Sequence, residues 1–315
     1  MLYLTTEKVR KSAVMLKPIK LTLLFCLTSL MTYAHISTKE KNALLAIYNA
    51  TQGDYWTQTW DLEADVSTWQ GLTIENNSVV AIDLSFNNLS GTLPIEIGHL
   101  HNLQTLNLFR NNISGVIPSS IGNLKQLETL NIAFNKLEGE LPETIGQLMS
   151  LVNLELFMNN INGSLPASIG NLSKLEKLAL FNNQLNGAIP TEIGNLSLLK
   201  EIYLSSNDLS GKIPSSIQNL TVLEKLSLFD NKLFGAIPSG LGKLARLQEL
   251  ILSDNLLYGI VPSELAELKS IKVLMLNNNQ VKGDFANLER KLPQGVQFEY
   301  RNLDKMKNSV LATND

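Results

Sequence analysis

The sequence has 315 residues, of which 44% are hydrophobic and 17% are charged, so the chain can bury a core and is not disordered as a whole. The formal net charge of −3 excludes the strong positive field typical of nucleic-acid-binding proteins. One cysteine excludes a disulfide scaffold, a cysteine-based zinc site and an iron–sulfur site, and three histidines argue against a histidine-rich metal site. The sequence therefore predicts no metal and no cofactor.

The first 34 residues have the order of a secretory signal. Basic residues between Lys8 and Lys20 precede an apolar run at residues 21–31, and a Thr-Tyr-Ala step ends at Ala34. The run is too short for a good membrane span, and no later segment is apolar enough to form one. We expect residues 1–34 to be a cleaved signal peptide, with no other transmembrane segment. The mature protein is then secreted, extracellular or at the cell surface, with the periplasm as an alternative.

Residues 35–78 are predicted to form an N-terminal cap. Ser37 and Glu40 have the spacing of a capping box at the start of a helix, and apolar residues follow at helical spacing. Trp56, Trp60 and Trp69 come next. We interpret the three tryptophans as the core of the cap, and the alternative is a platform on which a sugar stacks.

A period of 24 residues organises the chain from residue 79 to residue 292. Glycine and proline keep the same phase as asparagine, for example at Gly115 and Pro118. Such regularity is the signature of a solenoid made of repeated coils. The asparagine column, which we call the asparagine ladder, is Asn87, Asn111, Asn135, Asn159, Asn183, Asn207, Asn231, Asn255 and Asn279.

Each column of the repeat has a physical role. Leu106 and Leu108 alternate with period two, which predicts a short strand with both leucines inward. Strands of successive coils then pair in parallel, about 4.8 Å apart. Asn111 can bond backbone carbonyls that would otherwise be buried without a donor, and it can link one coil to the next. Gly115 permits a backbone conformation that a side chain would forbid.

Read from Leu103 to Pro118, the unit L-x-x-L-x-L-x-x-N-x-I-x-G-x-I-P resembles the leucine-rich repeat in its 24-residue plant-type form. The resemblance covers nine repeats at 79–292. It implies an α/β solenoid, a right-handed superhelix with a parallel β-sheet on its concave face and a helical N-terminal cap. Similar plant proteins include receptor ectodomains and polygalacturonase-inhibitor-like proteins, which implies a secreted, receptor-like binding protein. The paired cysteines of the plant cap are absent, which points to a bacterial relative.

The C-terminal end departs from the repeat. The proline is lost after Gly283, and Val296, Phe298 and Tyr300 alternate as in a strand. We expect residues 293–302 to form a closing strand and the polar residues 303–315 to form a flexible tail.

Two patterns occupy the positions that face away from the core. Phe109, Phe157, Phe181 and Phe229 share one column, with Phe86 and Phe134 one residue later in their coils and Tyr203 in a neighbouring column. Lys177, Glu201, Lys225 and Glu249 form a second column that alternates in sign. The predicted ligand-binding residues of the concave face are Phe109, Arg110, Phe134, Glu155, Phe157, Lys177, Phe181, Glu201, Tyr203, Lys225, Phe229, Asp230, Glu249 and Asp254.

Each pattern has two interpretations. Unburied rings near one another form a patch that monomers usually avoid, and aromatic side chains anchor interfaces. Alternatively, the rings stack on one another and stiffen the sheet. The charged column favours the sheet register through exposed pairs, each contributing about 0.2–1 kcal/mol. Its alternative role is to bind a charged or hydroxylated ligand.

The sequence thus predicts a binding protein that recognises a protein or peptide ligand through its concave sheet. The alternative is a carbohydrate-binding or adhesion protein, in which the phenylalanines stack on a polysaccharide. A glycosidase is a distant alternative, because Asp230 and Asp254 lie one coil apart and retaining glycosidases hold two carboxylates about 5 Å apart. A smooth sheet offers no deep pocket, so we expect no enzymatic activity and no catalytic residue. We also expect no nucleic-acid partner.

Overall fold

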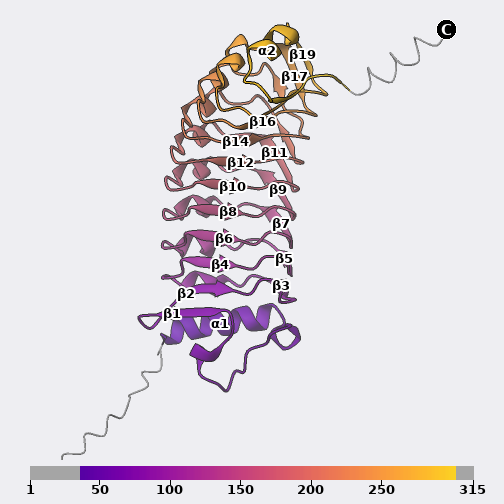
Figure 1. The fold of residues 1–315 in the computed structure, drawn as a ribbon. Coiled ribbons are helices and arrows are strands. Elements are labelled where there is room, and N and C mark those ends of the chain that lie inside the picture. Colours follow the sequence, from indigo (N-terminus) through magenta and orange to yellow (C-terminus); the bar gives the residue numbers. More distant parts are fainter. Residues whose placement is uncertain (1–35, 303–315) are drawn as a thin grey trace, which may run out of the picture. The chain divides into compact units, whose positions relative to one another are not determined.

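Each 24-residue period folds into one coil of a solenoid (Figure 1). A computed structural model describes residues 36–302 of the chain. The predicted signal peptide at 1–34 and the predicted tail at 303–315 lie outside the described residues. A coil runs from a strand on the concave side, through a strand on the flank, to a 3-10 helix on the opposite side.

The predicted parallel sheet is confirmed, and we call it the concave sheet. Its strands pair with a shift of one repeat, so that Leu106 lies beside Leu130 and Leu130 beside Leu154. Only the first pair, β1 with β2, is antiparallel. In spatial order the 11 strands are β1 (Leu72–Glu75), β2 (Ser78–Asp83), β4 (Thr105–Asn107), β6 (Thr129–Asn131), β8 (Asn153–Glu155), β10 (Lys177–Ala179), β12 (Glu201–Tyr203), β14 (Lys225–Ser227), β16 (Glu249–Ile251), β18 (Val273–Met275) and β20 (Gln297–Glu299).

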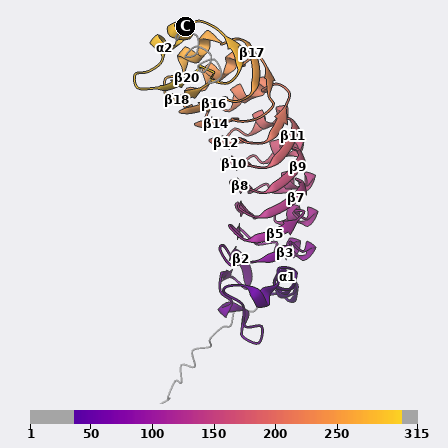
Figure 2. The same ribbon diagram turned by 90° about the vertical axis from the view of Figure 1, so that its right-hand side faces the viewer.

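A second set of strands, which the sequence analysis did not predict, covers one flank of the coils (Figure 2). Each begins just after a ladder asparagine, where alternate residues point outward. Six form one sheet: β3 (Ser90–Thr92), β5 (Asn112–Gly115), β7 (Lys136–Glu140), β9 (Asn160–Ser164), β11 (Gln184–Ala188) and β13 (Asp208–Ser210). Three form another: β15 (Phe234–Gly235), β17 (Leu256–Ile260) and β19 (Gln280–Lys282).

Short 3-10 helices line the side of the coils opposite the concave sheet. The repeated proline is the residue before each helix, in extended conformation, as Pro118 shows with a ψ of 142°. The glycine inside the helix lets neighbouring coils approach, because a Cβ on Gly146 would lie 2.3 Å from the Ser168 carbonyl oxygen. The helices are Ile95–His99, Ser119–Asn123, Glu143–Gln147, Ala167–Asn171, Thr191–Asn195, Ser215–Asn219, Ser239–Lys243 and Ser263–Glu267.

The leucine and isoleucine columns form one continuous core. Leu106 and Leu108 are buried, and so are Ile113 and Ile121 of the same coil. Gly115 has a φ of +71°, in the region that favours glycine, as predicted. Burial of these columns depends on the next coil, so each coil is stabilised by its neighbours rather than alone.

The asparagine ladder connects each coil to the preceding one. The Asn159 amide nitrogen donates to the carbonyls of Leu156 in its own coil and Ile132 in the preceding coil, both at 3.0 Å. Its Oδ1 accepts from the Leu137 N–H at 2.9 Å. The same bonds recur at Asn183, for example. One buried side chain therefore bonds three backbone groups, and each of the two carbonyls also accepts from a second ladder asparagine, Asn135 or Asn183.

One further asparagine, which the sequence analysis did not predict, bonds to the backbone of the last ladder residue. Asn302 donates to the Asn279 carbonyl at 2.8 Å and accepts from the Asn279 N–H at 3.3 Å. It follows Asn279 by 23 residues rather than 24, which is why the fixed period missed it. The closing strand β20 is thus the start of another coil, paired in parallel with β18.

The N-terminal cap covers the first coil with a helix and an aromatic cluster. Helix α1 (Thr38–Ala50) has the predicted capping box between Ser37 and Glu40. Glu40 also accepts from the Val79 N–H at 3.1 Å, which ties α1 to the sheet. The 3-10 turns Gly53–Tyr55 and Val66–Thr68 follow. The three tryptophans are buried with their ring N–H groups bonded to carbonyls, so they are core and not a sugar platform.

At the other end a helix that the sequence analysis missed, α2 (Phe285–Lys291), replaces the 3-10 helix of the repeat. Asp284 caps it by accepting from the Asn287 N–H at 3.0 Å. The Phe285 ring stacks on Tyr300, with centroids 4.5 Å apart. Asp284 therefore marks a helix start where the other coils have an apolar residue followed by proline. Among the helices of residues 36–302, none combines the length and apolar character needed to cross a membrane.

Replacing Asn159 with alanine should lower the free energy of unfolding by about 2 kcal/mol, because the buried Leu137 N–H loses its side-chain acceptor and the carbonyls of Ile132 and Leu156 each lose one of their two asparagine donors. Urea unfolding followed by circular dichroism measures the change. The exposed neighbour Asn160 provides the control, and Asn160→Ala should stay within about 0.5 kcal/mol of the wild type. Equal midpoints for the two variants would contradict a stabilising role of the ladder.

Candidate binding surface

Six aromatic rings form a continuous ladder on the concave sheet, and we call it the ring ladder. It consists of Phe86, Phe109, Phe134, Phe157, Phe181 and Tyr203, with consecutive centroids 4.4–6.5 Å apart. The rings leave the coils from β2 to β12, so the ladder is roughly 24 Å long at the usual strand spacing. The in-register stack thus brings together residues that are up to 117 positions apart in the sequence.

The ring ladder is partly exposed. Phe86 is 60% exposed and Phe134 is 36% exposed, whereas Phe109, Phe157 and Phe181 are half-buried against their neighbours. The Arg110 guanidinium lies over the Phe86 ring at 5.6 Å from its centroid, a cation–π contact at the first rung. The predicted aromatic residues other than Phe229 thus form one surface, and their rings contact one another, as the stiffening interpretation also requires.

Phe229 does not join the ring ladder. Ser205 occupies its column in the intervening coil, and among the described residues no ring contact links Phe229 to Phe181 or Tyr203. Ser205 instead shares a hydrogen bond of 2.6 Å with the hydroxyl of Ser227. The concave sheet therefore changes character near β14, from aromatic to hydroxyl-bearing and charged.

The residue after each strand turn has a left-handed backbone, a feature that the sequence analysis did not detect. Asn182, Asp230, Asp254 and Asn278 occupy this position in several coils, and asparagine and aspartate tolerate it best among non-glycine residues. Phe86, Phe134 and Met158 occupy the same position with φ between 54° and 55°. Bulky side chains there cost on the order of 1 kcal/mol each.

The predicted charge alternation is present in the backbone register, but the charged residues do not pair in one continuous series from coil to coil. Glu201 lies beside Lys225, and Lys225 beside Glu249, with nitrogen–oxygen distances of 3.4 Å and 3.9 Å. Lys177 pairs instead with Glu155 of the preceding coil, at 3.1 Å. Among the ion pairs of the described residues, Glu201 therefore pairs with Lys225 and not with Lys177. All these side chains remain partly exposed.

Tyr203 links the ring ladder to this charged cluster. Burial, and then the nearby Glu201 carboxylate, raise the pKa of Tyr203 above its ordinary value of 10.0, although the positive charge of Lys225 lowers it in part. The charge and hydrogen bonding of Tyr203, and then Glu201, raise the pKa of Lys225 above 10.5. The cluster therefore keeps Lys225 charged and Tyr203 neutral throughout the physiological pH range.

Asp83 is a concave-face carboxylate that the predicted site omitted. Burial alone would raise the pKa of Asp83, but hydrogen bonds from the Ser85 hydroxyl, the Ser85 N–H and the Asn107 amide bring it below its ordinary value. It lies at the end of β2, three residues before Phe86. The 24-residue register could have indicated it, since Asp83 and Asn107 share one column.

Asp230 and Asp254 occupy the turn position of consecutive coils, as the glycosidase alternative required. Asp254 accepts a hydrogen bond of 2.8 Å from the Asn278 side chain, and Asp230 is exposed. Within residues 36–302, no group of three His, Cys, Asp or Glu side chains is placed to hold a metal ion.

Tyrosine absorbance at 295 nm provides a test of the charged cluster. In the difference between wild type and Tyr203→Phe, the phenol should ionise with a midpoint above pH 10, because the folded pKa is raised. The stability that neutral Tyr203 contributes is then complete below pH 10 and is lost as the pH rises through the folded pKa. Lys225→Met should move the midpoint higher still, since it removes a cation. A midpoint at or below pH 10 would contradict the geometry.

Comparisons with known proteins agree with this fold. A family model for a leucine-rich repeat region matches residues 83–187, and a second model, for the leucine-rich repeat itself, matches 198–220, 222–244 and 246–268. The polygalacturonase inhibitor 1 of Arabidopsis thaliana is 33% identical over 97 residues, which are 29% of this chain and 29% of the inhibitor.

Solved plant receptors are similar over most of the chain. The ectodomain of the receptor kinase GASSHO1/SCHENGEN3 from Arabidopsis thaliana, in complex with CASPARIAN STRIP INTEGRITY FACTOR 2, has a TM-score of 0.69 and 32% identity, covering 77% of this chain and 33% of that chain. The plant peptide hormone receptor RGFR1, in complex with RGF2, has a TM-score of 0.66 and 37% identity, covering 70% and 39%.

The chain spans between 29% and 39% of the length of these three relatives. The two family models together match more than half of its residues, and the matched residues are the coils that form the concave sheet and its flank. On this evidence the chain belongs to the leucine-rich repeat proteins.

Proposed function

We propose that this protein is an extracellular binding protein that captures an extended protein or peptide ligand along the ring ladder of its concave sheet. The observation that carries the proposal is the ring ladder itself, six aromatic side chains partly open to solvent on one face. Rigid aromatic side chains lose little conformational entropy on binding and dominate the energetics of interfaces.

The strained turn positions favour a binding role over stiffening alone. The coils from Asn182 onward place small or polar residues at the left-handed position, without disturbing the stack. The coils of Phe86, Phe134 and Met158 keep large apolar side chains there, at a cost in stability. If these side chains served only to stiffen the sheet, replacing them with asparagine would relieve the backbone strain at this position. The presence of large apolar side chains there therefore supports recognition of a partner.

The similar plant receptors provide a second line of support. GASSHO1/SCHENGEN3 and RGFR1 are each solved in complex with a ligand, and the second is described as a peptide hormone receptor. By analogy, an extended peptide is the ligand class that the present sheet fits best. The same analogy, together with the predicted signal peptide at 1–34, supports secretion and a location outside the cell.

Ring geometry disfavours the carbohydrate alternative. Four of the contacts along the ring ladder are edge-on, with interplanar angles of 68–82°, and one pair, Phe157 with Phe181, is parallel at 10°. A sugar ring stacks on a flat aromatic face, whereas alternating edges and faces suit irregular apolar side chains. The proposal includes no catalytic step, because Asp254 accepts a hydrogen bond from Asn278 and Asp230 is exposed to solvent.

A displayed library of linear peptides and a glycan array, screened in parallel, test the proposal. Peptides should be enriched, and Phe157→Ala combined with Phe181→Ala should weaken their binding at least tenfold, because two anchors are lost. The melting temperature should change by only a few degrees, since the leucine core is untouched.

Tyr55→Ala is the matched control, because Tyr55 is an exposed aromatic residue of the cap, away from the concave sheet. It should leave peptide binding unchanged. Loss of cooperative unfolding in the double variant would indicate that the rings serve the sheet alone. Saturable binding of glycans, without peptides, would replace the proposal with the carbohydrate alternative.

A further inference from the structure

An apolar patch lies on the flank of the solenoid, away from the concave sheet. Strand β17 turns Leu256, Tyr258 and Ile260 outward at alternate positions, and they are 49%, 49% and 79% exposed. Phe234 of β15 lies beside Leu256 in the strand register and is 41% exposed. Together these four side chains, the flank patch, expose on the order of 400 Å², as much as the largest patch on a typical monomer.

The flank patch is specific to its coils. The corresponding outward positions of β9 are Asn160, Asn162 and Ser164, and those of β11 are Gln184, Asn186 and Ala188. The repeat therefore folds with polar residues on this flank, and the apolar residues of β17 are not required by the coil. Neither the core nor the concave sheet uses them.

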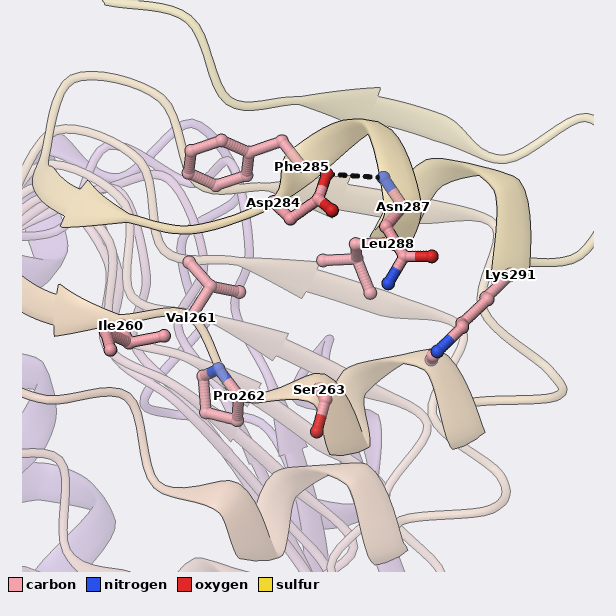
Figure 3. Close-up of a pocket in the computed structure, with 10 residues that line it drawn as sticks. Ile260, Val261, Pro262, Ser263, Asp284, Phe285, Asn287, Leu288 and Lys291 are labelled. Atoms are coloured by element: carbon pink, nitrogen blue, oxygen red, sulfur yellow. Dashed lines mark hydrogen bonds between the residues drawn. The ribbon is translucent and has the colours of Figure 1, made fainter.

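Beside the flank patch, a cleft of about 210 Å³ opens between α2 and the chain before the 3-10 helix Ser263–Glu267. Figure 3 shows Val261 and Leu288 from its two sides pointing into this space, with Ile260 at one edge and Lys291 at the other. Because Ile260 belongs both to the cleft lining and to the flank patch, the two are continuous. The cleft has the size to accept one large apolar side chain.

Lysines surround the flank patch. Lys282 lies beside Ile260 in the strand register, and the stem of Lys212 packs against Gly235, next to Phe234. Lys291 lines the cleft. None of the three takes part in an ion pair of the described residues, whose salt bridges lie elsewhere. The one carboxylate in the cleft lining, Asp284, accepts the helix-capping hydrogen bond of Asn287.

We propose that the flank patch is a second binding surface, for a protein segment with apolar side chains in its centre and acidic residues at its ends. The apolar centre would cover Leu256, Tyr258 and Ile260 and insert one side chain into the cleft. The acidic ends would pair with Lys212, Lys282 and Lys291. A standard interface buries about 800 Å² on each partner, roughly twice the exposed area of the flank patch, so a partner of that size would have to cover the lysines and the cleft as well.

Charge argues against a second copy as the occupant. A two-fold contact would place the flank patch against itself, and it would bring two rims with an excess of lysine together. An acidic partner removes this repulsion and satisfies cations that have no partner in the described residues. This surface is separate from the ring ladder and does not rest on the function proposed for it.

Two fluorescent 12-residue peptides test the proposal on the full-length protein. Both carry leucine, phenylalanine and leucine at alternate central positions, with glutamates at both ends of one and lysines at both ends of the other. The acidic peptide should bind at least tenfold more tightly in fluorescence anisotropy. Tyr258→Ser with Ile260→Ser should weaken it at least tenfold, and Lys282→Glu with Lys291→Glu should reverse the preference.

Two controls separate this surface from others. Asn186→Ser with Ala188→Ser, at the equivalent positions of β11, should leave the affinity unchanged, and so should Phe157→Ala with Phe181→Ala on the ring ladder. Circular dichroism should show the same fold for all variants, because every substituted side chain is at least partly exposed in the wild type.

Three results would overturn the proposal. Equal affinity, or no affinity, for the two peptides would remove the charge argument. A wild-type dimer in sedimentation velocity that Ile260→Ser dissociates would assign the flank patch to a second copy. Flotation with vesicles of phosphatidylcholine and phosphatidylglycerol, lost in the same variant, would assign it to a membrane surface.

Discussion

The constraint on which the whole structure depends is the need to satisfy buried backbone groups where each strand turns away from the concave sheet. A chain that turns in a dry interior leaves carbonyls and N–H groups without water. The ladder asparagines, illustrated by Asn159, meet this need with one side chain for three groups in two adjacent coils. These bonds join residues at fixed sequence separations in adjacent coils, so they also set the register between each coil and the next.

That register converts sequence columns into surfaces. Phe157 and Phe181 are 24 residues apart, yet their rings stack with centroids at 4.4 Å, and Lys225 reaches carboxylates from the coils on both sides. The same rule places Phe234 beside Leu256 on the flank. A surface of one character therefore forms where a residue type repeats at one position of the period, and it ends where another residue type takes that position, as Ser205 does in the aromatic column.

Much of the fold could be predicted from the sequence because it follows from periodicity. The parallel sheet, the buried leucines, the asparagine ladder and the capping box at Ser37 and Glu40 depend on residues that repeat or on local hydrogen bonds. The flank strands were missed because most coils place one apolar residue there between two polar ones, as with Leu137 between Lys136 and Glu138, and so short an alternation does not indicate a strand. Asn302 was missed because its spacing is one residue short, and α2 because only Asp284 marks its start. The left-handed backbone at the turn cannot be recognised from the sequence where phenylalanine or methionine occupies that position. Ligand binding by the predicted residues could not be established from the sequence, because it depends on a partner that the sequence does not describe.

The left-handed residues have a consequence for how such proteins diverge. Exchanging Phe86 or Phe134 for asparagine would relax the backbone, but it would also remove the ring contacts with Phe109 and Phe157. Under the proposed function, ligand binding is what favours the aromatic side chains over this relaxation. Variation at the turn position among related sequences would then distinguish the coils that contact the ligand from the coils that serve only as scaffold.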